Sequence, residues 1–147
     1  MRIAVLADTH DRLQPGLMQQ IASAQPDEIW HLGDVCGDWV LDELETLGKP
    51  LKVVRGNCDE EDWPLSLKFT LGGLCIWLEH IPSATAPQGI DLYLHGHTHV
   101  ARNERIGSTR FLNPGCITRP NQGLPRSWAI LTLEGDGKYG WELRNLD

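Results

Sequence analysis

His95-Gly96-His97-Thr98-His99 places three imidazoles at alternate positions, directly after the apolar run Ile90-Asp91-Leu92-Tyr93-Leu94. If residues 90–94 form a strand, its period of two carries all three imidazoles toward one side as the chain leaves the sheet. Imidazole is a common ligand of divalent transition metals in proteins. The stretch therefore predicts a metal site at the end of a strand.

Other ligand-type residues also follow apolar runs. Asp8 and His10 come after residues 2–7, Asp34 comes after residues 28–33, and Asn57 comes after residues 51–56. In open α/β sheets, ligands bind beyond the carboxyl ends of the strands. We therefore expect these side chains to share one site with the histidines.

Taken singly, each of these segments has an ordinary alternative interpretation. Asp8 and His10 in a strand-to-helix loop fit a helix cap and a surface residue. Gly56-Asn57-Cys58-Asp59 fits a turn held by local side-chain hydrogen bonds. Turn chemistry alone does not account for the joint occurrence of these segments, each just past an apolar run.

The first half of the chain predicts a βαβαβ pattern with parallel strands at 2–7, 29–32 and 51–54. Helices are expected within 13–25 and near 39–47, the second with Asp38 as its N-cap. After Pro64 the pattern changes to hairpins, 66–71 with 74–80 and 127–134 with 138–145. We expect a mainly antiparallel second half, and two sheets packed face to face with few helices outside.

Length and composition indicate one globular domain over residues 1–147, with 41% hydrophobic and 22% charged residues. No signal peptide or membrane span is evident, so we expect a cytoplasmic protein without a membrane partner. The four cysteines lack CxxC spacing, and we expect reduced thiols. A net charge of −7 without a basic stripe argues against binding to duplex nucleic acid. The oligomeric state stays open.

The motifs Asp8-Thr9-His10, Gly33-Asp34, Gly56-Asn57-Cys58-Asp59, Gly96-His97-Thr98-His99 and Asn113-Pro114-Gly115 together resemble those of the calcineurin-like metallophosphoesterases. Within that superfamily the chain is most similar to the small bacterial and archaeal phosphodiesterases, from Met1 to about Pro120. The resemblance implies an α/β fold, an αββα sandwich of two mixed β-sheets that holds two metal ions at the strand ends.

The resemblance also implies the ligands. Asp8, His10 and His99 would hold the first metal, Asn57, His80 and His97 the second, and Asp34 would bridge both. Of these, Asp34, Asn57 and His97 are predicted to be catalytic. This mixture of nitrogen and oxygen donors suits two divalent ions such as Mn, Fe, Zn or Ni, with Mn as our first choice. Two such ions would polarise the phosphoryl oxygens and activate hydroxide for attack on phosphorus.

Two positions depart from the family pattern. Leu78-Glu79-His80-Ile81-Pro82 lacks the usual His-Gly, so His80 has the alternative interpretation of a histidine that ends an exposed hairpin strand. Cys58 stands where protein phosphatases of the superfamily carry a histidine, and a thiol is a poor acid for a leaving oxygen. Cys58 alternatively fills a small buried space. His31 and His95 are expected to pack or to orient neighbouring residues.

We weigh three functions for a chain with these motifs. The leading prediction is a metal-dependent phosphoric diester hydrolase that acts on small phosphodiesters. The alternative is a non-catalytic, metal-binding scaffold for protein interaction, of the type of the eukaryotic retromer subunit, although a scaffold does not need all seven ligand-type residues. Cys58 and the small size of the chain disfavour a phosphomonoesterase or a protein phosphatase.

Overall fold

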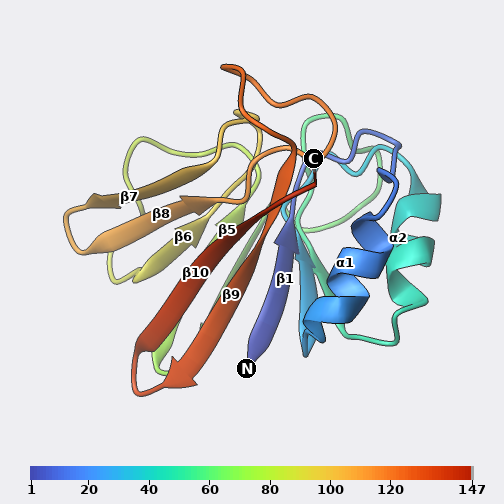
Figure 1. The fold of residues 1–147 in the computed structure, drawn as a ribbon. Helices are drawn as coiled ribbons and strands as arrows, with labels where there is room; N and C mark the ends of the chain where they lie inside the picture. Colours follow the sequence, from blue (N-terminus) through green and yellow to red (C-terminus); the bar gives the residue numbers. More distant parts are fainter. Residues whose placement is uncertain (147) are drawn as a thin grey trace.

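The computed structural model describes residues 1–146 and contains two five-stranded sheets that pack face to face (Figure 1). The first sheet has the order β10-β9-β1-β2-β3 and comprises β1 (Arg2–Leu6), β2 (Glu28–His31), β3 (Leu51–Val53), β9 (Ser127–Gly135) and β10 (Lys138–Asn145). The second sheet has the order β4-β5-β6-β8-β7 and comprises β4 (Ser66–Leu71), β5 (Leu74–Glu79), β6 (Leu92–Leu94), β7 (Arg102–Ile106) and β8 (Thr109–Asn113). The predicted sandwich of two mixed sheets is confirmed.

Both sheets combine parallel and antiparallel pairs. In the first sheet, β1, β2 and β3 run parallel, and the hairpin β9–β10 joins β1 in antiparallel orientation. In the second sheet, β6 lies parallel to both β5 and β8, between two antiparallel hairpins. The second half is mainly antiparallel, as expected, with β6 as the exception, because residues 80–91 form a crossover and not a tight turn between β5 and β6.

The main core lies between the two sheets. Strand β5 alternates buried and half-buried residues, and its inward-facing Ile76 and Leu78 contact a cluster that includes Val5, Trp30 and Leu131 of the first sheet. This alternation is what a strand with one face on a core requires. Strand β1 is buried from Ile3 to Leu6, because its other face is covered as well.

Helices α1 (Leu17–Ala24) and α2 (Asp38–Glu45) cover the outer face of the first sheet, on the side of β1 away from β6 and β8 (Figure 1). Their buried residues, which include Ile21 and Leu44, pack against Ala4 and Ile29 of the sheet. Helix α2 begins at Asp38 with Gly37 as its N-cap, so Asp38 lies one residue inside the position expected for it. Within residues 1–146 no helix has the length and apolar character to cross a membrane.

The outer face of the second sheet carries a smaller cluster of Ile90, Tyr93 and Phe111. Ala86, from the segment between β5 and β6, packs on this cluster, and residues 80–91 of that segment contain no helix. The helical layer of the sandwich is thus present on one side only within residues 1–146 (Figure 1).

Candidate metal centre

All seven residues predicted as ligands lie on loops that leave the carboxyl ends of strands from both sheets. Asp8 and His10 follow β1, Asp34 follows β2, and Asn57 follows β3. From the second sheet, His80 follows β5 directly, while His97 and His99 follow β6. The face-to-face packing of the sheets brings the two sets of loops to the same rim.

The first cluster consists of Asp8, His10 and His99, whose donor atoms all lie within 4.8 Å of one another. The Nε2 atoms of His10 and His99 are 3.2 Å apart. Oδ1 of Asp8 lies 3.3 Å from Nε2 of His99 and 3.6 Å from Nε2 of His10. These are the three residues that the sequence assigned to the first metal.

The second cluster consists of Asp34, His80 and His97, again with donor atoms within 4.8 Å of one another. Nε2 of His80 lies 3.2 Å from Oδ2 of Asp34. Oδ1 of Asn57 lies 3.0 Å from Nδ1 of His97, so the amide joins this group. His80 is buried, which contradicts the alternative that it ends an exposed hairpin strand.

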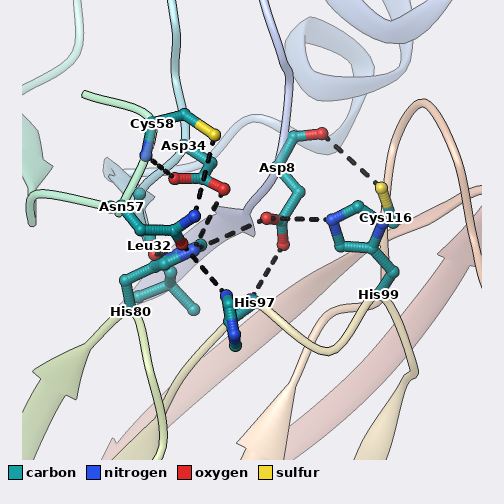
Figure 2. A network of polar contacts seen from close by, with 12 residues as sticks. Asp8, Leu32, Asp34, Asn57, Cys58, His80, His97, His99 and Cys116 are labelled. Atoms are coloured by element: carbon teal, nitrogen blue, oxygen red, sulfur yellow. Dashed lines mark hydrogen bonds and ion pairs between the residues drawn. The ribbon is translucent and has the colours of Figure 1, made fainter.

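The two clusters adjoin each other. Oδ2 of Asp34 lies 3.8 Å from Nε2 of His10, and Oδ1 of Asp8 lies 3.8 Å from Nε2 of His80. Figure 2 shows the carboxylates of Asp8 and Asp34 on the two sides of the space that His80, His97 and His99 border. Asp34 thus has the position that a ligand shared by two cations needs.

The hydrogen bonds of the imidazoles favour cation binding. Nδ1 of His80 donates to the carbonyl oxygen of Leu32 at 2.7 Å, and Nδ1 of His99 donates to that of Arg119 at 2.8 Å. A neutral imidazole that donates through one nitrogen presents a lone pair on the other, and metal-binding histidines are fixed in this way. In both residues the free atom, Nε2, points into the site.

Two buried atoms at the centre have no hydrogen-bond partner within residues 1–146, Oδ1 of Asp8 and Nε2 of His80. The two residues are 0% and 1% exposed. A buried polar atom without a partner costs about 1–3 kcal/mol. A cation between these atoms would satisfy both, so the donor set fits divalent metal ions.

The carboxylates stay ionised in this site. Burial alone would raise the pKa of Asp8, but the contacts with His10 and His99 hold it well below its usual range. Burial would likewise raise the pKa of Asp34, and the contact with His80 and the amide of Cys58 lower it. Burial opposes protonation of His80, yet Asp34 and Asp8 raise its pKa above the ordinary value. The site therefore attracts positive charge.

The ligand loops are held in left-handed backbone conformations. Asp8, His10, Asp34, His97 and His99 have φ angles of 59°, 47°, 54°, 69° and 58°. Residues other than glycine rarely adopt this region, and such residues cluster at functional sites. The φ angles of His97 and His99 end the strand alternation after His95. His95 still follows the alternation and lies beside Tyr93 and Arg102, outside both clusters, so the expectation that all three imidazoles share one side is wrong.

The glycines of the motifs allow the loops to approach one another. A Cβ atom on Gly56 would lie 2.2 Å from both the backbone nitrogen and Oδ1 of Asp34. A Cβ atom on Gly96 would lie 2.9 Å from Oδ2 of Asp8. Any larger residue at either position would push a carboxylate ligand out of place.

Asp59 supports the site and was not singled out from the sequence. Its Oδ2 atom accepts hydrogen bonds from the backbone nitrogens of Asp34 at 2.9 Å and Gly56 at 2.7 Å. Its Oδ1 atom accepts one from Cys36 at 2.9 Å. The carboxylate therefore ties together the loops after β2 and β3. Its place in the Gly56–Asp59 turn was the only signal in the sequence.

Three further buried polar side chains brace the loops. His31 accepts a hydrogen bond from the backbone nitrogen of Gly33 at 3.2 Å and lies 3.1 Å from the hydroxyl of Thr9. His95 lies 3.1 Å from Arg102, and Asn113 donates to the carbonyl oxygen of Gly96 at 3.1 Å. These contacts agree with the orienting roles expected of His31 and His95. None of the three side chains belongs to either cluster.

Cys58 is exposed, so the interpretation of this residue as a buried filler is wrong. Its backbone nitrogen donates to Oδ1 of Asp34 at 2.8 Å, and its side chain lies at the edge of the site. The turn of residues 56–59 uses its backbone to hold Asp34, and this leaves the side chain of Cys58 in solvent.

Comparison with known proteins extends these observations. A family model described as the calcineurin-like phosphoesterase superfamily domain matches residues 1–136. The chain is 30% identical to the probable metallophosphoesterase YsnB of Bacillus subtilis over 92% of this chain and 86% of that protein. It is 27% identical to the phosphodiesterase YfcE of Escherichia coli over 63% of this chain and 58% of that protein.

Solved structures share the fold. The structure of YfcE, a phosphoesterase from E. coli, superposes with a TM-score of 0.76 at 21% identity and covers 100% of both chains. The structure of Vps29 from Entamoeba histolytica, in complex with zinc, has a TM-score of 0.76 at 23% identity and also covers 100% of both chains. At these identities the likeness shows the fold alone.

Proposed function

The chain belongs to the calcineurin-like phosphoesterase superfamily, and on this premise we propose that it is a phosphodiesterase that uses two divalent metal ions to hydrolyse small phosphodiesters. The observation that carries the proposal is the pair of adjoining clusters, Asp8, His10 and His99 beside Asp34, His80 and His97, with Asn57 at the second. The relatives named as metallophosphoesterases support it.

Divalent ions such as Mn, when bound to a pair of sites of this kind, polarise the phosphoryl oxygens and lower the pKa of nearby water. Asp8, His10 and His99 would hold the first ion, Asn57, His80 and His97 the second, and Asp34 both. We expect Mn as the native ion, with Fe, Zn or Ni as alternatives, because the donors are imidazole, amide and carboxylate.

Backbone hydrogen bonds of the chain orient the carboxylates of Asp8 and Asp34. Oδ2 of Asp8 accepts a hydrogen bond from the backbone nitrogen of His97 at 3.1 Å, which leaves Oδ1 directed at the site. Oδ1 of Asp34 accepts from the amide of Cys58, which leaves Oδ2 directed at both clusters. His97 and Asn57 are exposed and would reach a phosphoryl group that arrives from solvent.

Two features favour a diester over a monoester. The exposed thiol of Cys58 is a weak proton donor, so a leaving group that departs without a strong acid is favoured. A cleft beside the second cluster is lined by Asn57 and His80 together with the exposed apolar side chains of Leu65 and Ile81. Such a cleft can receive the second, non-reacting substituent that only a diester carries.

A scaffold remains the alternative, because the zinc complex of Vps29 has the same fold. Metal binding alone cannot separate the two functions, since that neighbour also binds a metal. Turnover can. A catalytic centre needs ionised carboxylates, an open face and both clusters, and a scaffold needs none of these.

The test is a comparison of substrates with the Mn-loaded protein. An activated aryl phosphodiester and the matching aryl phosphomonoester are supplied at equal concentration, and release of the aryl alcohol is followed. We expect faster hydrolysis of the diester and loss of the rate when a chelator removes the metal. Equal or faster hydrolysis of the monoester would contradict the diesterase, and absence of turnover with either would favour the scaffold.

A further inference from the structure

We propose that Cys36 and Cys58 form, with His10 as a residue shared with the first cluster, a site for a soft, thiophilic metal ion such as Cd²⁺ or Cu⁺ at the edge of the two clusters. The Sγ atoms of the two cysteines and one ring nitrogen of His10 all lie within 4.8 Å of one another. Neither cysteine belongs to the ligand set of the proposed phosphodiesterase.

The geometry is close to that of a bound ion. In a tetrahedral site, Zn–S distances of ~2.3 Å and Zn–N distances of ~2.0–2.1 Å place sulfur and nitrogen ligands about 3.6 Å apart. Sγ of Cys36 lies 3.7 Å from Nδ1 of His10. These two donors therefore need little movement to share one ion.

The site is open and its backbone is fixed. Cys58 is exposed and Cys36 is half-buried, and both line a depression together with Glu60 and Glu61. His10 is half-buried beside Cys36. Asp59, adjacent to Cys58, accepts a hydrogen bond from the backbone nitrogen of Cys36 and so joins the two cysteine loops. A dissolved cation can enter, and either glutamate or water can serve as its fourth ligand.

Ligand softness separates this site from the phosphodiesterase centre. The two clusters offer imidazole, amide and carboxylate donors, which suit borderline ions, whereas a pair of thiols selects soft ions. An ion that prefers sulfur therefore has a reason to bind at Cys36 and Cys58 in the presence of Mn.

His10 connects the two sites. Its Nε2 atom faces Asp8 and His99, while its Nδ1 atom faces Cys36. A neutral imidazole has one lone pair, so His10 can serve the first cluster or the thiol site but not both. If the proposed function holds, a soft ion at the thiols withdraws His10 from the first cluster and inhibits hydrolysis.

The binding test uses the Mn-loaded full chain, kept reduced and titrated with Cd²⁺, with the thiolate-to-cadmium charge-transfer absorption as the readout. We expect saturation at about one equivalent in the wild type. Loss of a second-shell partner already costs about ten-fold to a hundred-fold in metal affinity, so Cys36→Ser and Cys58→Ser should each weaken binding at least as much. Cys75→Ser, which changes a cysteine on the outer face of the second sheet, is the matched control and should bind like the wild type.

Unchanged absorption in either Cys36→Ser or Cys58→Ser, or an equal loss in Cys75→Ser, would overturn the site. The absorption arises only from thiolates, so it tests the proposal even if the protein hydrolyses no phosphodiester. Where turnover is present, the rate should fall as the absorption rises, and Cys36→Ser should be about ten-fold less sensitive to Cd²⁺. Saturated absorption with an unchanged rate would refute the competition for His10.

Discussion

At the scale of single residues, most of the residues at the site have a backbone φ angle outside the regions that residues other than glycine usually adopt. Five of the predicted ligands, Asp8, His10, Asp34, His97 and His99, have positive φ. Conformations of this kind cost of order 1–3 kcal/mol each where the surroundings impose them on a residue. The motifs indicate these residues from the sequence because the residue types are unusual together. The strand alternation ends at the positive φ angles of His97 and His99, which is why the separation of these two imidazoles from His95 could not be predicted.

Of the proposed ligands, we expect Asp34 to be the most sensitive to substitution. Asp34→Asn removes a negative charge that faces both clusters, since Oδ2 lies near His10 and near His80. We expect both metal affinities to fall together and the rate of diester hydrolysis to drop far below a tenth of wild type. Retention of more than a tenth, a loss under about 1.4 kcal/mol in transition-state stabilisation, would argue against the shared role.

The second cluster can be tested separately through His80. His80→Ala removes a buried imidazole, a proposed ligand, from that cluster and leaves Asp8, His10 and His99 in place. We expect bound metal, measured by elemental analysis, to fall from two ions toward one per chain, with most catalysis lost because both ions act together. His95→Gln, which changes a buried histidine outside both clusters, should keep two ions. Two ions and full activity in His80→Ala would show that another group completes the second site.

At the scale of elements, the parallel strands of the first sheet, both helices and the two expected hairpins were predictable because apolar periodicity and turn glycines mark them. The hairpin β7–β8 was not, since β7 is mostly exposed and polar, and its sequence Arg102-Asn103-Glu104-Arg105-Ile106 carries no apolar alternation. Its position beside β6 is fixed by contacts between residues distant in sequence. The position of the hairpin β9–β10 beside β1 in the first sheet is likewise fixed by contacts between residues distant in sequence.

Asp59 makes the connection between elements testable. Asp59→Asn replaces one acceptor oxygen with a donor, opposite backbone nitrogens that can only donate. We expect metal affinity to fall about ten-fold or more, and the free energy of unfolding in urea to fall by about 2 kcal/mol. Asp136→Asn in the exposed β9–β10 turn is the control and should change neither quantity. A wild-type metal affinity in Asp59→Asn would mean that the two loops hold their positions without this carboxylate.

At the scale of the whole molecule, the two sheets bring together loops that begin more than sixty residues apart in the chain, Asp8 with His99 and Asp34 with His97. That these residues meet at one rim was predictable because each follows a strand, and their division into two sets came from the resemblance to the family. The sequence could not predict that the supporting histidines, His31 and His95, would be wholly buried, since burial depends on how the sheets pack.

Burial of these two histidines makes stability depend on pH. Burial lowers the pKa of His31 and of His95 to about 4 in the folded protein, against an ordinary value of 6.5. Between these values the unfolded chain binds more protons than the folded one, so stability is present above pH 6.5 and is lost as pH falls toward 4. The pKa of His80 and of His99 is raised, so their protonation affects stability above this pH window. The pKa of Asp8 and of Asp34 is lowered, so their protonation affects stability below it.

Urea unfolding of the metal-free protein at about pH 6.5 and pH 4.5 measures this effect. We expect a loss of about 2 kcal/mol for each of the two histidines. His95→Gln should remove about half of the pH dependence, whatever its effect on stability at neutral pH. A free energy of unfolding that stays constant across this range would show that the two imidazoles become protonated in the folded state without penalty.

The central claim, two cooperating metal ions that hydrolyse a phosphodiester, is tested most directly by following turnover as Mn is added to the metal-free protein. At protein concentrations well above the metal dissociation constants, we predict that the rate of aryl diester hydrolysis rises to a plateau only at about two equivalents per chain. A plateau at one equivalent, or no hydrolysis at any metal content, would contradict the claim.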